Sequence, residues 1–398
     1  MSAQTVERRL QQHRHLPQKR RSRTWLPVLA GGTLAFQLAC AGQRMLQAPP
    51  TPVDVERSGL GYPVYRIPAL AVTNKGTLIA AYDGRPTMAD VPSNIALLVR
   101  RSVDGGASWL PRQVVRADTA PLGYGDPSFL VDRTTGRIFL FHVAAVRQGF
   151  GGSARGNDES DPDILQADYS WSDDDGITWR HRRITSAIKN PAWGGIFAAS
   201  GQGIQLQYGR YAGRLIQQFV VRRGNENFAA SAYSDDHGAS WQMGELVGPG
   251  ADENKVVELS DGRVMLNSRA KPFRLIATSV DGGHGYTALR PDLQLIDPAN
   301  NGAIIRANTN APQGSASARR LVFSNTADST QRRNLTIRLS CDDGRTWPVA
   351  VVVDPGAAAY STIAMLPSGE LGVLYERGPY QYITFTRVTL QWPRESAS

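Results

Sequence analysis

The sequence predicts an all-β protein, because two turn motifs alternate along the chain between short runs of alternating apolar residues. The first motif is Ser-x-Asp-x-Gly-x-Thr-Trp, as in Ser340–Trp347. Its Asp can bond nearby backbone amides, its Gly suits a positive φ, and its aromatic residue can anchor the turn. We therefore expect each copy of this motif to be the turn of a β-hairpin.

Both motifs recur along the chain. Internal repeats are a stronger indication of the overall architecture than any single local pattern. The first motif has five copies, of which the fourth is degenerate: Ser102–Trp109, Ser172–Trp179, Ser234–Trp241, Ser279–Tyr286 and Ser340–Trp347. The second motif is a strand, a tight turn with Gly and an apolar strand, centred on Gly76, Gly136, Gly213, Gly262 and Gly369. A further hairpin, in which Ile304-Ile305 pairs with Leu321–Phe323, is expected to lack the Gly turn.

The alternation of the two motifs predicts six four-stranded antiparallel units, a six-bladed β-propeller over residues 57–392. We expect an N-terminal strand to close the last blade. The strand directions place both turn types on one face. Residues just before the first strand, after the second or before the third of each blade emerge on the opposite face, where a propeller binds small molecules.

The charge of the chain is concentrated at its start. The 398 residues carry a formal net charge of +9, with 41% hydrophobic and 20% charged residues, a composition typical of a globular protein. Seven Lys or Arg residues and one acidic residue fall within residues 1–41, so most of the excess belongs to that segment. The high pI therefore gives no argument for nucleic-acid binding, and the histidines show no metal-ligand spacing.

Residues 1–41 resemble a secretory signal peptide. A basic start is followed by an uncharged, largely apolar run from Trp25 to Ala41, and Ala39-Cys40-Ala41 fits a cleavage site. Two alternatives remain open: an uncleaved anchor, and a lipoprotein anchored through Cys40. We expect residues 42–56 to be a spacer and the protein to be secreted without stable membrane insertion.

Charged and aromatic side chains flank the predicted inner strands on the face opposite the turns. A single Arg or Glu at a strand end is usually a solvated rim residue. Their convergence on one face instead indicates a site. The residues are Arg66, Arg85, Asp90, Glu253, Arg269, Arg332, Tyr360 and Glu376.

The motif Tyr65-Arg66-Ile67-Pro68, combined with the repeated Asp-containing turns, resembles the bacterial exo-α-sialidases (neuraminidases) of the retaining propeller family. The resemblance covers about residues 60–390 and is greatest to compact secreted actinobacterial members. It implies hydrolysis of terminal sialic acids from glycoproteins, glycolipids and oligosaccharides, with no cofactor and no metal. We expect sialylated glycans as partners and a monomeric protein.

The resemblance also implies a carboxylate-binding triad of Arg66, Arg269 and Arg332. Guanidinium forks bind carboxylates in a bidentate manner and stay charged. Arg332 is preferred to Arg333, because the family pattern is Arg, one residue, Asn or Asp, and then an apolar residue. Glu376 resembles the acid that braces the first arginine.

Tyr360 resembles the family's nucleophile and Glu253 its base. A carboxylate nucleophile would be repelled by the carboxylate of sialic acid, whereas a phenol is neutral but needs a neighbouring base. Asp90, on the loop Ala89–Pro92, resembles the general acid and base. Arg85 resembles the arginine on the ring-hydroxyl side of the sugar, and Asp126 a further pocket acid.

Phe150 and Phe197 are candidates for an apolar N-acyl pocket. Three other functions remain open on the sequence. A trans-sialidase would need an acceptor site of aromatic residues, and a hydrolase of a related nonulosonic acid would prefer a sugar that lacks the N-acyl group. A non-catalytic sialic-acid-binding propeller would be favoured by loss of the catalytic residues, but all of them are present.

Overall fold

The computed structural model describes residues 51–390, so the expected leader and most of the expected spacer lie outside the described residues. The described part is nearly all β, as predicted. Its helical elements are one short helix, α1 (Thr185–Ile188), and two 3-10 turns, η1 (Gly209–Tyr211) and η2 (Ser317–Arg319). Between residues 51 and 390 no helix is long and apolar enough to span a membrane.

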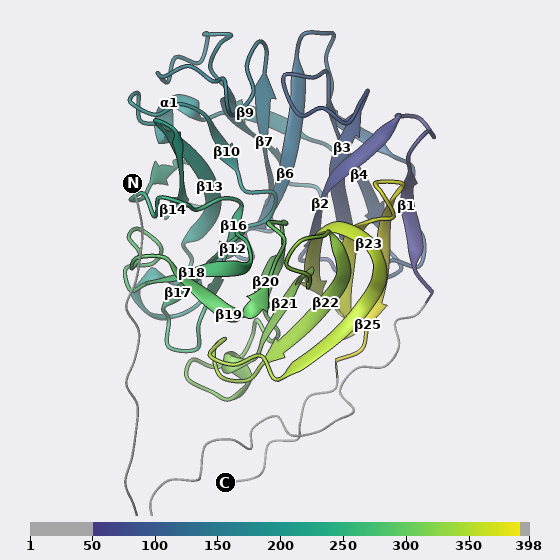
Figure 1. Ribbon diagram of the computed structural model, residues 1–398, viewed down its shortest axis with the longest axis vertical. Coiled ribbons are helices and arrows are strands. Elements are labelled where there is room, and N and C mark those ends of the chain that lie inside the picture. The colour runs from purple at the N-terminus through teal and green to yellow at the C-terminus, as the bar shows by residue number, and fades with distance from the viewer. Residues whose placement is uncertain (1–50, 391–398) are drawn as a thin grey trace, which may run out of the picture. The chain divides into compact units, whose positions relative to one another are not determined.

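The strands pair antiparallel in groups that follow one another along the chain (Figure 1). Blade 1 consists of β2 (Val64–Val72), β3 (Leu78–Arg85), β4 (Ala96–Ser102) and β5 (Gln113–Arg116). Blade 2 consists of β6 (Gly123–Val131), β7 (Ile138–Ala145), β8 (Gln166–Ser172) and β9 (Arg180–Arg183). Blade 3 consists of β10 (Ile196–Ala198), β12 (Ile204–Gln205), β13 (Leu215–Arg223), β14 (Glu226–Ser234) and β15 (Gln242–Met243). Blade 4 consists of β16 (Asn254–Glu258), β17 (Val264–Ser268), β18 (Phe273–Ser279) and β19 (Arg290–Ile296).

The last two blades share one long strand, β23 (Val349–Met365), and therefore appear as a single seven-stranded sheet. The first half of β23 is the outer strand of blade 5, beside β20 (Ala303–Arg306), β21 (Leu321–Thr326) and β22 (Arg333–Ser340). Its second half is the inner strand of blade 6, beside β24 (Leu371–Arg377) and β25 (Tyr382–Val388). This pairing is consistent with six blades.

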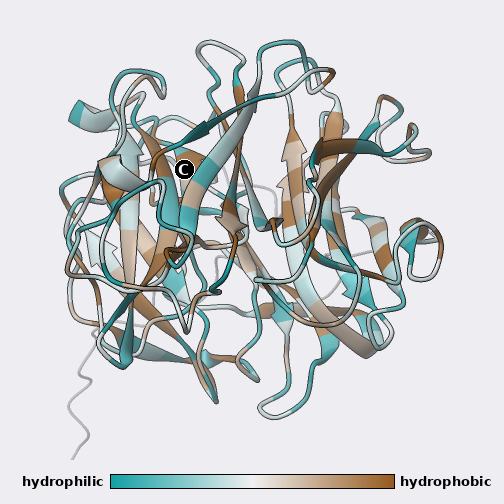
Figure 2. Cartoon of the chain, turned by 90° about the horizontal axis from the view of Figure 1, so that it is seen from above, coloured by the Kyte–Doolittle hydropathy of each residue, from teal (hydrophilic) through white to brown (hydrophobic). Residues whose placement is uncertain are grey.

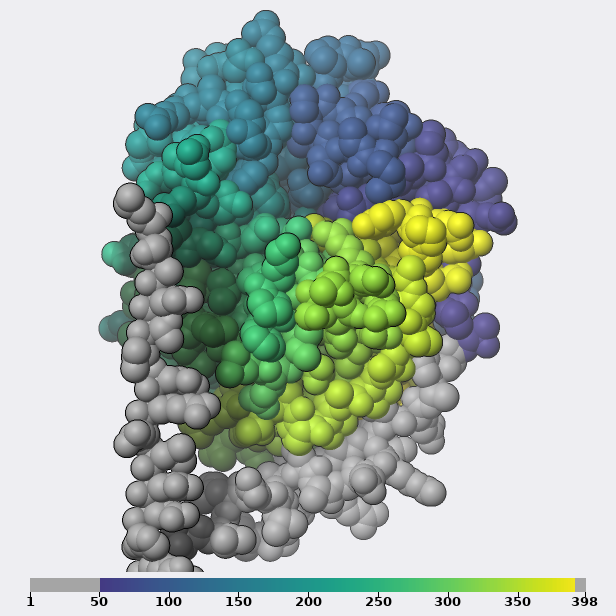
Figure 3. Space-filling view, in the orientation of Figure 1, coloured from purple at the N-terminus to yellow at the C-terminus, as the bar shows by residue number. Residues whose placement is uncertain are grey.

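An N-terminal strand closes the last blade, as the sequence predicts. Strand β1 (Val53–Arg57) pairs antiparallel with β25, and Figure 3 shows the purple N-terminal segment beside the yellow C-terminal one. Because β1 begins at Val53, the end of the segment that we expected to be a spacer belongs to the fold.

The inner strand of blade 3 is interrupted, which the sequence did not indicate. Between β10 and β12 the chain leaves β13, and β11 (Gly201–Gln202) pairs in parallel with β6 of blade 2. Gly201 has a φ of 121°, a conformation that favours glycine. The detour brings Ser200 next to Asp126 of the neighbouring blade.

The hydrophobic core lies within and between adjacent blades. One cluster joins residues such as Ala69 and Val99 of blade 1 to Phe129 and Leu140 of blade 2. Figure 2 shows brown, hydrophobic residues along the strands and teal, hydrophilic ones in many of the loops. This distribution follows from the period-two alternation of apolar residues in the sequence.

The Asp-containing turns link adjacent blades. Asp175, in the turn of blade 2, accepts hydrogen bonds from the hydroxyls of Thr73 and Thr77, which flank the Gly turn of blade 1, at 2.5 and 2.7 Å. Asp343, in the turn of blade 5, accepts a 2.8 Å bond from the backbone of Ser260 beside the Gly turn of blade 4. The two turn types therefore share one face, as predicted.

Candidate active site

The residues predicted for the site lie at the ends of inner and second strands or, for Arg332, just before a third strand, on the face opposite these turns. Arg66 is in β2, Asp126 in β6 and Tyr360 in β23, whereas Glu253 immediately precedes β16 and Arg269 follows β17. Five of the blades therefore contribute between one and three of these side chains each to a shared polar cluster.

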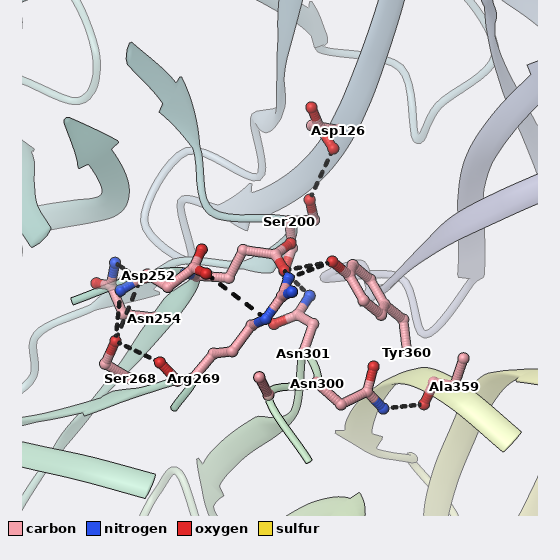
Figure 4. A network of polar contacts seen from close by, with 12 residues as sticks. Asp126, Ser200, Asp252, Asn254, Ser268, Arg269, Asn300, Asn301, Ala359 and Tyr360 are labelled. Carbon is pink, nitrogen blue, oxygen red and sulfur yellow. Dashed lines mark hydrogen bonds and ion pairs between the residues drawn. The ribbon is translucent and has the colours of Figure 1, made fainter. Parts of the chain in front are cut away.

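Tyr360, Glu253 and Arg269 form a closed triangle of hydrogen bonds. The Tyr360 hydroxyl donates to Glu253 Oε2 at 2.5 Å. Arg269 Nη1 donates to the same carboxylate oxygen at 2.6 Å and to the Tyr360 hydroxyl at 2.7 Å. Figure 4 shows the tyrosine ring pointing its hydroxyl at the guanidinium. A phenol and a carboxylate are thus in direct contact, which is the geometry needed to pass a proton between them.

The environment of Tyr360 holds its proton in place in this state. Burial and the negative charge of Glu253 raise the pKa of the Tyr360 phenol well above its ordinary value, while Arg269 and Arg66 lower it. Glu253 and Tyr360 are 2% and 6% exposed. A charge placed on either group would therefore be felt strongly by the other.

Glu376 fixes two parts of the site at once. It is fully buried, and it accepts hydrogen bonds from Arg66 Nε at 3.0 Å and Nη2 at 3.4 Å. It also accepts bonds from the backbone amides of Ile67 at 2.9 Å and Tyr360 at 3.0 Å. Burial alone lowers the pKa of Arg66, but Glu376 and Tyr360 raise it overall, so this guanidinium is permanently charged.

Arg332 faces the cluster and Arg333 faces away from it. The guanidinium of Arg332 lies 5.3 Å from the centre of the Tyr360 ring, whereas Arg333 pairs with Asp328 at 2.6 Å. Arg332 Nη1 also donates to the hydroxyl of Tyr380 at 3.1 Å, and Arg66 stacks on the Tyr380 ring at 4.6 Å.

Sequence reasoning missed Tyr380. The sequence places Tyr380 in the turn between Gly378 and β25, and that position is its only signal in the sequence. In the structure Tyr380 has a φ of 60°. Positive φ at a residue other than glycine often marks a constrained functional position.

Asp90 and Arg85 are in contact at the rim of the site. Arg85 Nη1 donates to Asp90 Oδ1 at 2.6 Å, although the Arg85 side chain is 1% exposed and that of Asp90 is 75% exposed. On its other edge Arg85 donates to Asp83 Oδ2 from Nε at 3.0 Å and from Nη2 at 2.7 Å. Arg85 therefore joins a solvent-exposed carboxylate to a fully buried one.

Asp83 is a second residue that sequence reasoning did not assign to the site. Burial raises its pKa to about 6, although Arg85 opposes this effect. The pKa of half-buried Asp126 is also raised well above its ordinary value. Burial is the largest cause, followed by the negative charges of Asp83 and Asp90. The Ser200 hydroxyl donates to Asp126 at 3.4 Å. These carboxyl groups form an acidic part of the site around Arg85.

Phe150 and Phe197 lie together, with ring centres 4.9 Å apart in an edge-to-face contact. They pack in one cluster with Val91, which directly follows Asp90. An apolar wall thus adjoins the loop that carries the exposed carboxylate. Within the described ranges, no group of three or more His, Cys, Asp or Glu side chains could hold a metal ion.

The cluster as a whole can bind an anion beside a phenol. Arg66, Arg269 and Arg332 all lie within 6 Å of the Tyr360 ring centre. A carboxylate bound by these guanidiniums would be held next to the phenol oxygen, with Glu253 available to accept the phenol proton.

Known proteins resemble this chain over most of its described part. The family model of the BNR repeat-like domain matches residues 76–373. The sialidase of Micromonospora viridifaciens is 51% identical over 397 residues, which are 95% of this chain and 61% of that protein. The sialidase of Bacteroides fragilis (strain YCH46) is 31% identical over 346 residues, or 82% of this chain and 62% of that protein. The chain thus spans about three fifths of the length of these two relatives.

The solved structure of Hadza microbial sialidase Hz136 has a TM-score of 0.76 and 29% identity to this chain, covering 85% of this chain and 68% of that one. The matched residues 76–373 include Glu253, Arg269 and Tyr360 of the polar cluster, whereas Arg66 and Glu376 lie just outside them. The chain therefore belongs to the BNR repeat-like family, and the members that it resembles are sialidases.

Proposed function

We propose that the protein is an exo-α-sialidase that hydrolyses terminal, α-ketosidically linked sialic acids with retention of configuration. One observation carries the proposal: the Tyr360 hydroxyl lies between the carboxylate of Glu253 and the guanidinium of Arg269. A buried phenol with a base at hydrogen-bond distance is an activated nucleophile. Tyrosine is also the nucleophile in the one glycosidase class whose substrate carries a carboxylate on the reacting carbon.

The three arginines would bind the substrate carboxylate and orient the sugar. The Arg66 guanidinium is already held by Glu376 on one edge and by the Tyr380 ring on its face. Binding a substrate to groups that are already fixed costs little ordering entropy. The negative charge of the substrate would also reduce the net positive charge around Tyr360.

In the first step the Tyr360 oxygen would attack the anomeric carbon while Glu253 takes the phenol proton. Asp90 would protonate the departing glycosidic oxygen, which leaves with the aglycone. In the second step Asp90 would remove a proton from water, the water oxygen would displace the tyrosine oxygen, and Glu253 would return its proton to Tyr360. Two displacements at one carbon retain its configuration.

Asp90 must hold a proton to act as an acid. Its carboxylate is exposed and paired with Arg85 at 2.6 Å. A bound sugar would cover the loop and compete for Arg85. The neighbouring Phe150, Phe197 and Val91 would contact the N-acyl group.

The partners would be sialylated glycans, and the leader in residues 1–41 favours secretion of the enzyme. The similarity to proteins named sialidases supports the reaction class, although this chain corresponds to only part of their length.

The test is hydrolysis of a fluorogenic α-sialoside by the wild-type protein, by Tyr360→Phe and by Tyr380→Phe. We expect turnover by the wild type and a loss on the order of a hundredfold or more in kcat for Tyr360→Phe, which lacks the nucleophile. Tyr380→Phe, a matched removal of a phenol oxygen, should mainly raise KM, because it alters the support of Arg332. NMR should show the α-anomer of sialic acid as the first product. No turnover by the wild type, or the β-anomer first, would refute the proposal.

A further inference from the structure

The hairpin of blade 5 differs from the other inner hairpins, because a loop of residues 307–320 connects β20 to β21 in place of a tight Gly turn. This loop is packed against blade 3. The Tyr208 hydroxyl donates to the carbonyl oxygen of Ala311 at 2.6 Å, and Tyr208, Ala311 and Ala318 form a buried apolar cluster. The loop is therefore held in a defined position by contacts with blade 3.

A cavity of about 710 Å³ lies beside the loop and is lined by residues of all six inner strands. It lies at the other end of the strands that carry the candidate active site. On β16, for example, Glu253 precedes the strand and belongs to the site, whereas Glu258 ends it and lines the cavity. A rise of about 3.3 Å per residue separates these two positions by roughly 17 Å. The volume is that of a small-molecule site.

Buried polar side chains fill the channel between the two ends. Lys255, in the middle of β16, donates to Asn301 Oδ1 at 2.9 Å, and Asn301 donates to the carbonyl oxygen of Ser200 at 2.9 Å. A Cβ atom on Gly201 would lie 2.9 Å from Lys255 Cε and 3.9 Å from Thr362 Oγ1, so segments of three blades meet there. The cavity is therefore separate from the site around Tyr360.

The charged groups of the cavity are mainly cationic. Lys75, Arg133 and Arg306 line it, and Glu258 is the one acidic residue among the lining residues of the described part. Glu258 is already satisfied: it accepts bonds from the backbone amides of Gln207 and Tyr208 and, at 3.1 Å, from Arg306 Nη1. It therefore adds little repulsion toward an incoming anion.

Several donors of the cavity have no protein partner within residues 51–390. Arg306 is 7% exposed and its Nε is buried without a hydrogen bond. No carboxylate of the described residues pairs with Arg133 or Lys75, which lie at the exposed rim. A buried polar group without a partner is costly, and in native proteins water or a ligand usually satisfies it.

Groups suited to hydroxyls adjoin these cations. Gln207 uses its carbonyl oxygen to bond Arg306 Nη2 and keeps its amide nitrogen available. Thr309 and Asn310, from the loop of blade 5, line the same cavity. Side-chain amides and hydroxyls with free donors and acceptors match the pattern of a sugar ring.

We propose that this cavity is a second ligand site, which binds a small hydroxylated carboxylic acid of monosaccharide size. Arg133 and Lys75 bind the carboxylate, Arg306 Nε donates to a ring or hydroxyl oxygen, and the amides of the rim bind the remaining hydroxyls. The site is independent of the proposed hydrolase reaction, because it lies at the opposite end of the channel.

The test is isothermal titration of the full-length protein with D-glucuronate at low ionic strength, with glucose and acetate as comparison ligands. The variants are Arg133→Gln, at the cavity, and Arg263→Gln, an exposed arginine that pairs with Asp261 on the same face but outside the cavity. Both positions are exposed, so both variants should fold. Arg269→Gln tests whether glucuronate binds instead at the arginines around Tyr360.

We expect saturable binding of glucuronate that weakens roughly tenfold or more in Arg133→Gln, since a charged hydrogen bond is lost. Arg263→Gln and Arg269→Gln should bind as the wild type does, and glucose and acetate should each bind at least about tenfold more weakly. The proposal is overturned if no saturable binding occurs, if Arg133→Gln binds normally, if acetate binds as well as glucuronate, or if Arg269→Gln abolishes the binding.

Discussion

The buried carboxylate of Asp83 links the stability of the protein to pH at a single residue. Its pKa is about 6 in the folded state against an ordinary 3.8, because burial outweighs the attraction of Arg85. The folded protein thus binds this proton more tightly than the unfolded chain. The contribution of Asp83 to stability is fully present below about pH 4 and is lost as pH rises to about 6.

The raised pKa of Asp83 predicts a pH-dependent difference in stability between the wild type and Asp83→Asn. The asparagine does not titrate, so the variant should gain stability relative to the wild type between pH 4 and 6, by up to about 3 kcal/mol. Urea unfolding of both proteins at several pH values measures the difference, and other titrating groups cancel in the subtraction. A difference that changes in the opposite direction would mean that the pair with Arg85 dominates and that the pKa of Asp83 is lowered.

Glu376 is the residue whose charge supports the largest number of site groups. Replacing it by Gln leaves the Arg66 guanidinium, which is 10% exposed, without its counter-charge. Breaking a buried pair in this way costs about 3–5 kcal/mol. We predict that Glu376→Gln lowers the free energy of unfolding by that order and raises KM for a sialoside more than it lowers kcat, because Arg66 loses its orientation.

Glu370→Gln is the control for this prediction. Glu370 lies near Arg387 at 3.9 Å, on the turn before β24, and its side chain is 27% exposed. Its replacement should change stability by less than about 1 kcal/mol and leave the kinetics unchanged. Equal effects of the two variants on KM would show that Glu376 does not act through Arg66.

At the scale of elements, the sequence predicted regular structure well and irregular structure poorly. The Gly and Asp turns have side-chain signatures, so the hairpins around them followed from spacing alone. The β-bulges at the site have no such side-chain signature. In one of them the register of β2 shifts between Arg66 and Ala69, and Ile67 has a φ of 58°. A β-branched residue such as isoleucine rarely adopts a positive φ, so the surrounding fold must impose this conformation. One of the contacts that do so is the hydrogen bond from the Ile67 amide to the carboxylate of Glu376.

The same limit applies to the site residues. The predicted residues could be found because each follows or precedes a recognisable strand or matches the quoted motif. Tyr380 could not, since its importance arises from a contact across the fold, to Arg332, that no local pattern records. Asp83 pairs with Arg85 two residues along the same strand, but its complete burial is a property of the folded protein that the local sequence does not show.

The turn of blade 2 offers a test of how adjacent blades are held together. Asp175 accepts hydrogen bonds from Thr73 and Thr77 of blade 1 and pairs with Arg101 at 2.9 Å. Removing it leaves these donors unpaired, so Asp175→Ala should lower the free energy of unfolding by about 2–3 kcal/mol. The kinetics should not change, because the turn lies on the face opposite the site.

Asp173→Ala is the matched control two residues earlier. Asp173 is half exposed, and its ion pair among residues 51–390 is with the exposed side chain of Arg137, so its loss should cost less than about 1 kcal/mol. Urea unfolding and sialoside hydrolysis of both variants check the prediction. A loss of activity in Asp175→Ala at full stability would contradict a purely structural role for the turn.

For the propeller as a whole, stability depends on the joint between the first and last segments of the fold. Strand β1 covers the edge of β25, and Val55 is buried there. Glu56 in the same strand accepts hydrogen bonds from Tyr82 at 2.6 Å, from Arg100 at 2.9 Å and from Arg112 at 2.6 Å. One strand thus covers an open sheet edge and supplies a carboxylate that pairs with two cations of blade 1.

Removal of β1 should therefore destabilise all blades together. A chain of residues 58–398 exposes the edge of β25, which invites aggregation, and leaves the partners of Glu56 unpaired. We expect it to unfold at clearly lower urea than a chain of residues 51–398, or to be insoluble. Glu56→Gln keeps the strand and removes only the charge, so it should retain the fold and lose about 3 kcal/mol or more. The prediction would be contradicted if the chain of residues 58–398 and Glu56→Gln both unfolded at the same urea concentration as the chain of residues 51–398. The propeller would then be closed by the packing between blades 1 and 6, to which Leu70 and Leu374 belong.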